Sequence, residues 1–216
     1  MTVARRVAAL VGVLVLALAG CTETPKVRAD DPVVSVPTAV DPASAAASTP
    51  ALAKQKKAAG LPDCPTSDAA VAPVAKGLPD LTLACLGGGR STRLAGLRGT
   101  PMIINIWGQW CPECRTEAPF LAEVSRRAGS RLRVIGIDYD DQRPELAIAF
   151  AQQAGWTYPQ LFDQDRAVTD ALRLPAGAPQ TIFVRADGGI SYVSVKPYAS
   201  TTALRADLNT HLGLTL

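Results

Sequence analysis

Two cysteines three positions apart, Cys111 and Cys114, are the residues of this chain best suited to chemistry. They follow an apolar run at 102–107, which is typical of a buried strand, and a short polar break at 108–109. A helix that begins directly after Cys111 would place its thiol beside unpaired backbone N–H groups and the positive end of the helix dipole. Both effects favour a thiolate, the form that carries out thiol–disulfide exchange. We therefore expect a redox reaction at these two residues.

Cysteine pairs with this spacing also bind zinc, and a structural zinc site needs four ligands. The one histidine, His211, lies in the last turn of the final expected helix, and Cys64 and Cys85 do not form a second C-x-x-C pair. The N-terminal segment also indicates export to an oxidising compartment, where a disulfide is the expected state. The sequence therefore favours redox chemistry over zinc, and we expect neither a metal nor an organic cofactor.

Residues 1–21 have the pattern of an export signal, because Arg5 and Arg6 precede an apolar stretch at 7–20. That stretch is too short to span a bilayer core. It ends in Leu-Ala-Gly before Cys21, which resembles the bacterial lipobox. The resemblance implies a lipidated Cys21 and a position on the extracytoplasmic face of the bacterial cell membrane. An ordinary cleaved signal and an uncleaved anchor are the alternatives.

The next segment, 22–60, is rich in proline, alanine, serine and threonine, and this composition predicts a flexible tether without a core. One folded domain is expected at 61–216, since the chain is long enough for one sizeable core. The net charge of +3 comes without a basic stripe interleaved with aromatic residues. The sequence therefore gives no indication of nucleic-acid binding.

Periodicity and turn residues predict the elements that would position the cysteines. Strands are expected at 81–86, 91–94, 102–107, 131–138, 158–162, 180–184 and 190–195, and helices at 112–128, 144–154, 164–172 and 201–212. The first two strands would form an N-terminal β-hairpin. Strands that alternate with helices, followed by a second hairpin and a helix, indicate an α/β fold. We expect a central mixed sheet with helices on both faces and a helix-containing insertion in the middle.

Two motifs together resemble the thioredoxin superfamily. They are WCPEC at 110–114, with Pro119 five residues on, and GAPQTIF at 177–183. More narrowly, they are similar to the membrane-tethered thiol–disulfide oxidoreductases of the TlpA/ResA type. The resemblance covers about residues 76–213 and implies a thioredoxin-like fold there.

The resemblance also implies roles for individual residues. The first cysteine of the family attacks and the second resolves the mixed disulfide, which carries over to Cys111 and Cys114. The proline opposite the active site is cis in the family, which carries over to Pro179; a simple turn proline is the alternative. Glu117 lies three residues beyond Cys114 and so shares a helix face with it. The family has a buried carboxylate here that handles protons, whereas the alternative is an exposed helix glutamate.

The residues around the pair suggest how a substrate is held. We expect Trp110 to be a contact surface beside the thiols, and Trp107 to belong to the core. A cis bond at Pro179 would leave the Ala178 backbone free to pair with an extended substrate segment. The chain departs from many relatives in having Glu113, not proline, before the second cysteine. An acid there disfavours the thiolate and shifts the reduction potential.

The remaining pair, Cys64 and Cys85, flanks the start of the expected domain. Because an exported protein would not keep two idle thiols, we predict a structural disulfide that fastens the segment 61–65 to the first strand. The chain-entropy model gives such a bond roughly 3 kcal/mol. The alternative is a second redox pair that relays electrons, although neither cysteine has a C-x-x-C or helix-start context.

These observations predict a lipid-anchored, extracytoplasmic thiol–disulfide oxidoreductase that acts on exported proteins. Its expected partners are thiols or disulfides of those proteins, including apocytochrome c, and a membrane electron donor, and we expect a monomer. Some relatives reduce apocytochrome c before haem attachment and others oxidise folding substrates; the resemblance around Glu117 favours the reductant. The alternatives are a disulfide-forming oxidase, a metal-delivery module on the same fold, and a purely structural surface lipoprotein.

Overall fold

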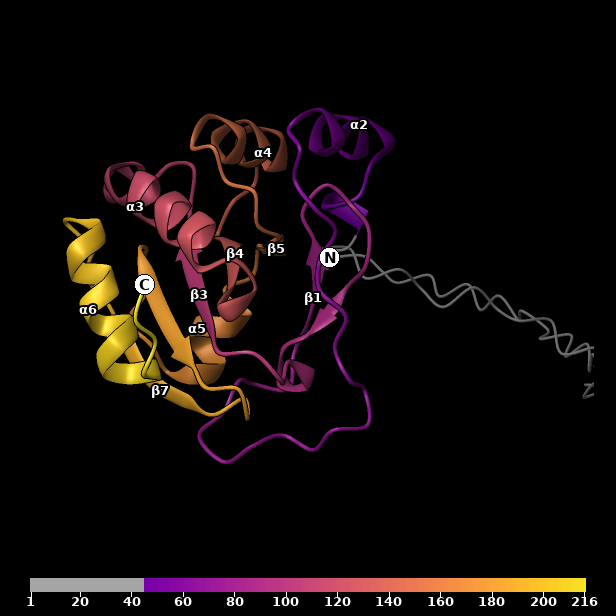
Figure 1. Cartoon of the computed structure of the whole chain (residues 1–216). Helices are drawn as coiled ribbons and strands as arrows, with labels where there is room; N and C mark the ends of the chain where they lie inside the picture. Colours follow the sequence, from indigo (N-terminus) through magenta and orange to yellow (C-terminus); the bar gives the residue numbers. More distant parts are fainter. Residues whose placement is uncertain (1–44) are drawn as a thin grey trace, which may run out of the picture. The chain divides into compact units, whose positions relative to one another are not determined.

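A seven-stranded mixed sheet is the centre of the computed structural model, which describes residues 45–216 (Figure 1). Its strands are β1 (Thr82–Cys85), β2 (Thr92–Arg93), β3 (Met102–Trp107), β4 (Arg133–Tyr139), β5 (Gln160–Asp163), β6 (Gln180–Val184) and β7 (Ile190–Ser194). The helices are α2 (Pro50–Ala58), α3 (Pro112–Ala128), α4 (Pro144–Gln153), α5 (Ala167–Leu172) and α6 (Thr201–Leu212), with 3-10 turns η1 (Leu94–Gly96) and η2 (Gly129–Arg131). Within the sheet the strand order is β2-β1-β5-β4-β3-β6-β7.

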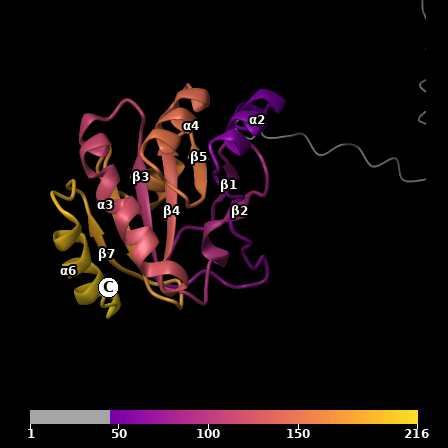
Figure 2. The same ribbon diagram turned by 45° about the horizontal axis from the view of Figure 1, so that its top comes forward.

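The central strand β3 is buried on both sides, so its alternating side chains enter two separate cores. Ile103 and Trp107 belong to the core beneath α3, α4 and α6. Ile104 and Ile106 belong to the opposite core, which α5 and η1 cover. Figure 2 shows α3 and α6 side by side on one face of the sheet. The predicted class, an α/β sheet with helices on both faces, is confirmed.

Pairing registers fix where the loops of the sheet meet. Strand β3 runs parallel to β4 and antiparallel to β6, with Ile106 opposite Gln180. The residues that follow β3 therefore lie beside the residues that precede β6. The predicted hairpin forms from β1 and β2, with Leu83 opposite Thr92. The helix α4 and strand β5 supply the predicted insertion, and β5 joins the sheet parallel to β4.

The prediction of a flexible tether at 22–60 is wrong for its last part, because residues 50–58 form helix α2. The Thr49 side chain accepts a hydrogen bond from the Leu52 backbone N–H at 3.2 Å and so caps this helix. Leu52 is buried, and Gln55 Nε2 donates to the backbone carbonyl of Glu145 at 2.7 Å, which joins α2 to α4 (Figure 1). The predictions for 1–21, for Cys21 and for 22–44 lie outside the described residues.

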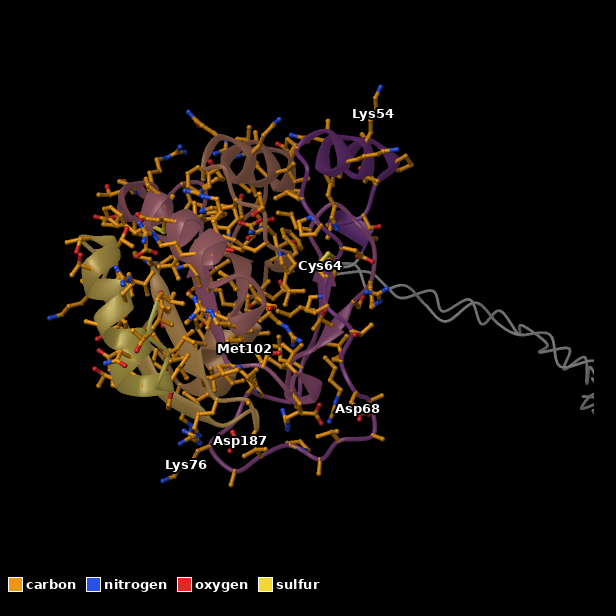
Figure 3. The ribbon with its side chains drawn as sticks, viewed as in Figure 1. Lys54, Cys64, Asp68, Lys76, Met102 and Asp187 are labelled. Atoms are coloured by element: carbon orange, nitrogen blue, oxygen red, sulfur yellow. A yellow bond between two sulfur atoms is a disulfide. The ribbon has the colours of Figure 1, made fainter. Side chains whose placement is uncertain are left out.

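An irregular segment, 61–80, connects α2 to the sheet. Figure 3 shows it passing from Cys64, beside the hairpin, to Lys76, near the turn at Asp187. There the Ile190 N–H donates to the Lys76 carbonyl at 3.0 Å, which ties the segment to β7. Within residues 45–216, no helix has both the length and the apolar character needed to cross a membrane.

Candidate active site

The two central cysteines form a disulfide at the start of α3. Cys111 is the N-cap residue of this helix, and the backbone N–H of Cys114 donates to Cys111 Sγ at 3.1 Å. This hydrogen bond and the helix dipole both stabilise a thiolate at Cys111, which is the form that acts as the nucleophile. Cys111 is only 1% exposed in this disulfide form, so its sulfur is buried here.

Glu117 lies behind the pair, one turn along α3, and is 1% exposed. Its carboxyl group accepts hydrogen bonds from Asn105 Nδ2 at 2.9 Å and from the Tyr198 backbone N–H at 3.0 Å. Burial raises the pKa of Glu117 to about 7, against the opposing effect of these two hydrogen bonds. The alternative of an exposed helix glutamate therefore does not apply. A carboxyl group with this pKa can take up or release a proton near neutral pH.

The loop before β6 forms the opposite wall of the site. The Ala178–Pro179 peptide bond is cis, and the Ala178 carbonyl oxygen lies 3.5 Å from Cys111 Sγ. The antiparallel register of β3 and β6 brings these residues together although 67 positions separate Ala178 from Cys111. An extended polypeptide beside Ala178 would therefore pass directly over the reactive sulfur.

Two side chains border Cys111 on the outside. Trp110 is 43% exposed, and its ring covers Gly108 so closely that a Cβ there would lie 2.6 Å from the ring. The absence of a side chain at Gly108 thus leaves room for the indole ring. The Glu113 carboxylate oxygen Oε2 is 4.0 Å from Cys111 Sγ. Negative charge at this distance opposes the formation of a Cys111 thiolate.

Cys64 and Cys85 are joined by a second disulfide, with their Cα atoms 5.7 Å apart. It links the irregular segment 61–80 to β1, away from α3. Three sheet spacings separate β1 from β3, or about 14 Å. The structure therefore brings Cys111, Cys114, Glu117 and Ala178–Pro179 together, and it leaves Cys64 and Cys85 outside that group.

The partners of Glu117 were not predicted from the sequence. Asn105 is the polar residue in the otherwise apolar strand β3, on the same side as Ile103 and Trp107, and this alternation could have placed it under α3. The Tyr198 N–H comes from the loop before α6, 81 residues from Glu117 in the chain, and no local signal points to it.

A buried acid pair near the active-site loop was also missed. Asp138, at the end of β4, is fully buried, and neither of its carboxyl oxygens has a hydrogen-bond partner among the described residues. Burial, and then the neighbouring Asp141 carboxyl, raise the pKa of Asp138 well above its usual range. Burial likewise raises the pKa of Asp141, which the Gln109 side chain contacts. The sequence signal for this pair is the acidic run at 138–141, which begins inside the apolar strand β4.

His211, the residue weighed as a zinc ligand, stacks on Tyr192 with ring centroids 4.0 Å apart. Among residues 45–216, no three histidine, cysteine, aspartate or glutamate side chains are grouped so that they could hold a metal ion. The chemistry that the grouped residues offer is exchange between two sulfurs, with a carboxyl group to move the proton.

Comparison with known proteins agrees with this geometry. A model of the AhpC/TSA family matches residues 74–193. The thiol:disulfide interchange protein DsbE of Allochromatium vinosum is 38% identical over 102 residues, 47% of this chain and 54% of the relative. The thiol-disulfide oxidoreductase ResA of Geobacillus kaustophilus is 28% identical over 138 residues, 62% of this chain and 73% of the relative. The chain spans about half the length of the DsbE relatives that it matches.

A solved structure extends the likeness to three dimensions. A secreted disulfide oxidoreductase of Mycobacterium tuberculosis, homologous to Escherichia coli DsbE, aligns with a TM-score of 0.54 and 25% identity. The alignment covers 61% of this chain and 96% of that one. The family match contains both the Cys111–Cys114 pair and Pro179, and it spans more than half of the 216 residues. This chain therefore belongs to the AhpC/TSA family and has its thioredoxin-like fold.

Proposed function

We propose that this protein is a thiol–disulfide oxidoreductase that reduces disulfides in exported proteins. One observation carries the proposal: the Cys111–Cys114 disulfide lies at the start of a helix, between the Ala178 carbonyl and the buried Glu117. The relatives DsbE and ResA, whose names describe thiol–disulfide interchange and oxidoreduction, support the same class of reaction.

The reaction begins from the reduced pair. The Cys111 thiolate attacks one sulfur of a substrate disulfide, so that a bond forms between Cys111 and that sulfur while the substrate disulfide breaks. The other substrate sulfur leaves as a thiolate and takes a proton from solvent. Before the attack, the Cys114 N–H at 3.1 Å and the helix dipole hold the Cys111 thiolate. Trp110 and the Ala178 backbone hold the substrate chain beside it.

Resolution requires Cys114 to lose its proton. Glu117, three residues further along the same helix face, accepts that proton as a general base. The Cys114 thiolate then attacks Cys111 Sγ, the bond between Cys111 and the substrate breaks, and the second substrate sulfur leaves as a thiolate that takes a proton from solvent. The substrate gains two electrons, and the protein returns to the disulfide form that the structure describes.

The charge beside Cys111 favours the reductant over the oxidase. A carboxylate 4.0 Å from Cys111 Sγ destabilises the thiolate and so destabilises the reduced protein. A less stable reduced form has a lower potential and gives its electrons away more readily. By the family resemblance, the substrates include apocytochrome c before haem attachment, and a membrane thiol–disulfide protein supplies the electrons.

The proposed location follows from the N-terminal sequence. A lipid on Cys21 would hold the protein, as a monomer, on the extracytoplasmic face of the bacterial membrane. The segment 22–44 would be the tether, because helix α2 occupies residues 50–58 of the predicted tether. In the proposed organisation, the residues from α2 onward belong to the folded domain.

The deciding experiment is the reduction potential of the Cys111–Cys114 pair in the full chain. The protein is equilibrated with graded dithiol buffers, and alkylation of the peptide that holds both cysteines is followed by mass spectrometry. A potential near −270 mV or lower supports the reductant, whereas a value above about −180 mV identifies an oxidase. The Cys111→Ser variant is the control in a disulfide-reduction assay, and full activity in that variant would remove the enzymatic proposal itself.

A further inference from the structure

A buried lysine lies beside the second disulfide. Lys56 of α2 is 8% exposed, and its Nζ is 3.0 Å from Cys85 Sγ and 2.7 Å from the Gly88 carbonyl oxygen. The nearest carboxylate, Asp63, is 3.9 Å away, and its side chain is 48% exposed. The lysine stem is closely packed, since a Cβ at Gly87 would lie 2.7 Å from Lys56 Cβ. The ammonium group is thus held against the disulfide by the fold.

Apart from the Gly88 carbonyl, this ammonium group has weak partners in the oxidised protein. A disulfide sulfur is a weak hydrogen-bond acceptor, and Asp63 also pairs with Arg90 at 3.7 Å. Burial accordingly lowers the pKa of Lys56, and Asp63 opposes this only in part. Reduction would change the contact, because a Cys85 thiolate at the same place is an anionic acceptor for Lys56.

We propose that Cys64–Cys85 is a second redox site, which exchanges with an external dithiol and at which Lys56 holds Cys85 as a thiolate after reduction. One thiolate of the dithiol attacks Cys64 Sγ, the disulfide breaks, and Cys85 leaves as a thiolate beside Lys56. The second thiol of the dithiol loses its proton and attacks the dithiol sulfur that is bonded to Cys64, which closes the dithiol into a disulfide. The bond to Cys64 breaks, and Cys64 leaves as a thiolate and is protonated. Two electrons enter the protein, and one proton is released overall.

The electrons do not come from the Cys111–Cys114 pair. Strands β4 and β5 lie between β3 and β1, which are thus about 14 Å apart, and the two disulfides belong to the two opposite cores of the sheet. Direct attack of one pair on the other requires contact between sulfurs. The second site therefore works independently of the proposed function, and its reductant is a dithiol outside this chain.

Access to Cys64 requires a local opening, since both sulfurs are buried. Cys64 lies in an irregular stretch, 62–67, that makes no backbone–backbone hydrogen bond within the described part of the chain. Side-chain contacts hold this stretch, such as the bond from Arg90 to the Cys64 carbonyl at 2.9 Å. A stretch without backbone–backbone hydrogen bonds can open locally while the core stays folded.

The test equilibrates the full chain with oxidised and reduced dithiothreitol, quenches it with acid, and counts alkylated Cys64 and Cys85 by mass spectrometry. A charge-assisted hydrogen bond changes an equilibrium by roughly tenfold or more. Lys56→Met should therefore lower the equilibrium constant for reduction at pH 7 by at least about tenfold, or about 30 mV. Lys57→Met, a matched change on the exposed side of the same helix, should leave it unchanged. Equal constants for wild type and Lys56→Met would overturn the proposal.

A second readout needs only the wild-type chain, so it does not depend on how the variant folds. If Cys85 is a thiolate after reduction, one proton is released, and the equilibrium constant for reduction rises roughly tenfold per pH unit between pH 7 and 8. If Cys64 and Cys85 both become thiols, this constant is independent of pH. The charged groups that face this site are Lys56, Asp63 and Arg90. A flat profile would refute a Cys85 thiolate. Rates measured with reduced thioredoxin in place of dithiothreitol distinguish a protein dithiol from a small one as the natural reductant.

Discussion

Replacing Glu117 with glutamine should slow the resolution of the mixed disulfide without slowing its formation. The carboxyl group has a pKa of about 7, so the fraction able to accept the Cys114 proton falls tenfold for each pH unit below 7. Resolution in the wild type should therefore be about 100-fold slower at pH 5 than at its plateau above pH 7. Because the amide cannot accept this proton, Glu117→Gln should lose the pH dependence and stay at or below the slow rate.

The assay is a single turnover of the reduced protein with a disulfide-bonded peptide. Acid quench at successive times, followed by mass spectrometry, separates the mixed disulfide from the resolved product. In Glu117→Gln at pH 8 the mixed disulfide should accumulate, since general-base catalysis contributes about 10²- to 10⁴-fold. A variant that resolves with the wild-type pH profile would refute the role given to Glu117, as would a slowed first step with a normal second one.

The pH dependence of the free energy of unfolding of Glu117→Gln is a control, and its direction can be predicted. The folded-state pKa of Glu117 is raised from 4.5 to about 7, so the native protein favours the protonated form. Stability from this group is complete below about pH 4.5 and is lost as the pH rises to 7, by about 3 kcal/mol. Glutamine is uncharged throughout, so urea unfolding of Glu117→Gln should depend less on pH across this interval. If Glu117→Gln is folded but resolves the mixed disulfide slowly, the slow step is due to the loss of proton transfer.

Three further predictions test the surroundings of the site. Glu113→Gln should raise the potential of the Cys111 pair by about 20 mV, because it removes a charge 4.0 Å from the sulfur; an unchanged or lower value in dithiol titration would contradict this. Asp138→Asn should stabilise the protein at pH 7 by roughly 1 to 3 kcal/mol. It should have little effect below about pH 3, where the carboxyl is neutral in both the folded and the unfolded chain; urea unfolding at the two pH values checks it. Replacing Cys64 and Cys85 together with serine should cost roughly 3 kcal/mol in the same assay, and a loss below 1 kcal/mol would mean that the bond scarcely restricts the unfolded chain.

The part of the site that depends on neighbouring residues could be predicted from the sequence. The apolar run 102–107 and the helix after Cys111 agree with β3 and α3, because buried strands and helix starts have strong local signals. The placement of Glu117 on the same face as Cys114 follows from helical spacing alone. The approach of the Tyr198 N–H depends on how α6 packs on α3, and periodicity contains no information on that contact.

Helix α2 was missed because its buried surface is unusual in composition. It has one large apolar side chain, Leu52, in a segment rich in alanine and lysine, so its pattern resembles that of a solvated linker. Its second buried side chain is Lys56, and lysine is among the residues least often buried. The methylene stem of Lys56 supplies apolar contact while its ammonium group reaches the Gly88 carbonyl. Residue types alone therefore do not reveal that Lys56, one of the two buried side chains of α2, packs against the domain.

The two disulfides have opposite charges beside them, and this difference shifts their reduction potentials in opposite directions. Cys111 Sγ lies 4.0 Å from the Glu113 carboxylate, whereas Cys85 Sγ lies 3.0 Å from the Lys56 ammonium group. A negative neighbour destabilises a thiolate and lowers the potential, and a positive neighbour stabilises a thiolate and raises it. The first pair would therefore give electrons away, and the second pair would retain them. Since the two pairs belong to opposite cores of the sheet, the state of the second would follow the dithiols around the protein and not the turnover of the first.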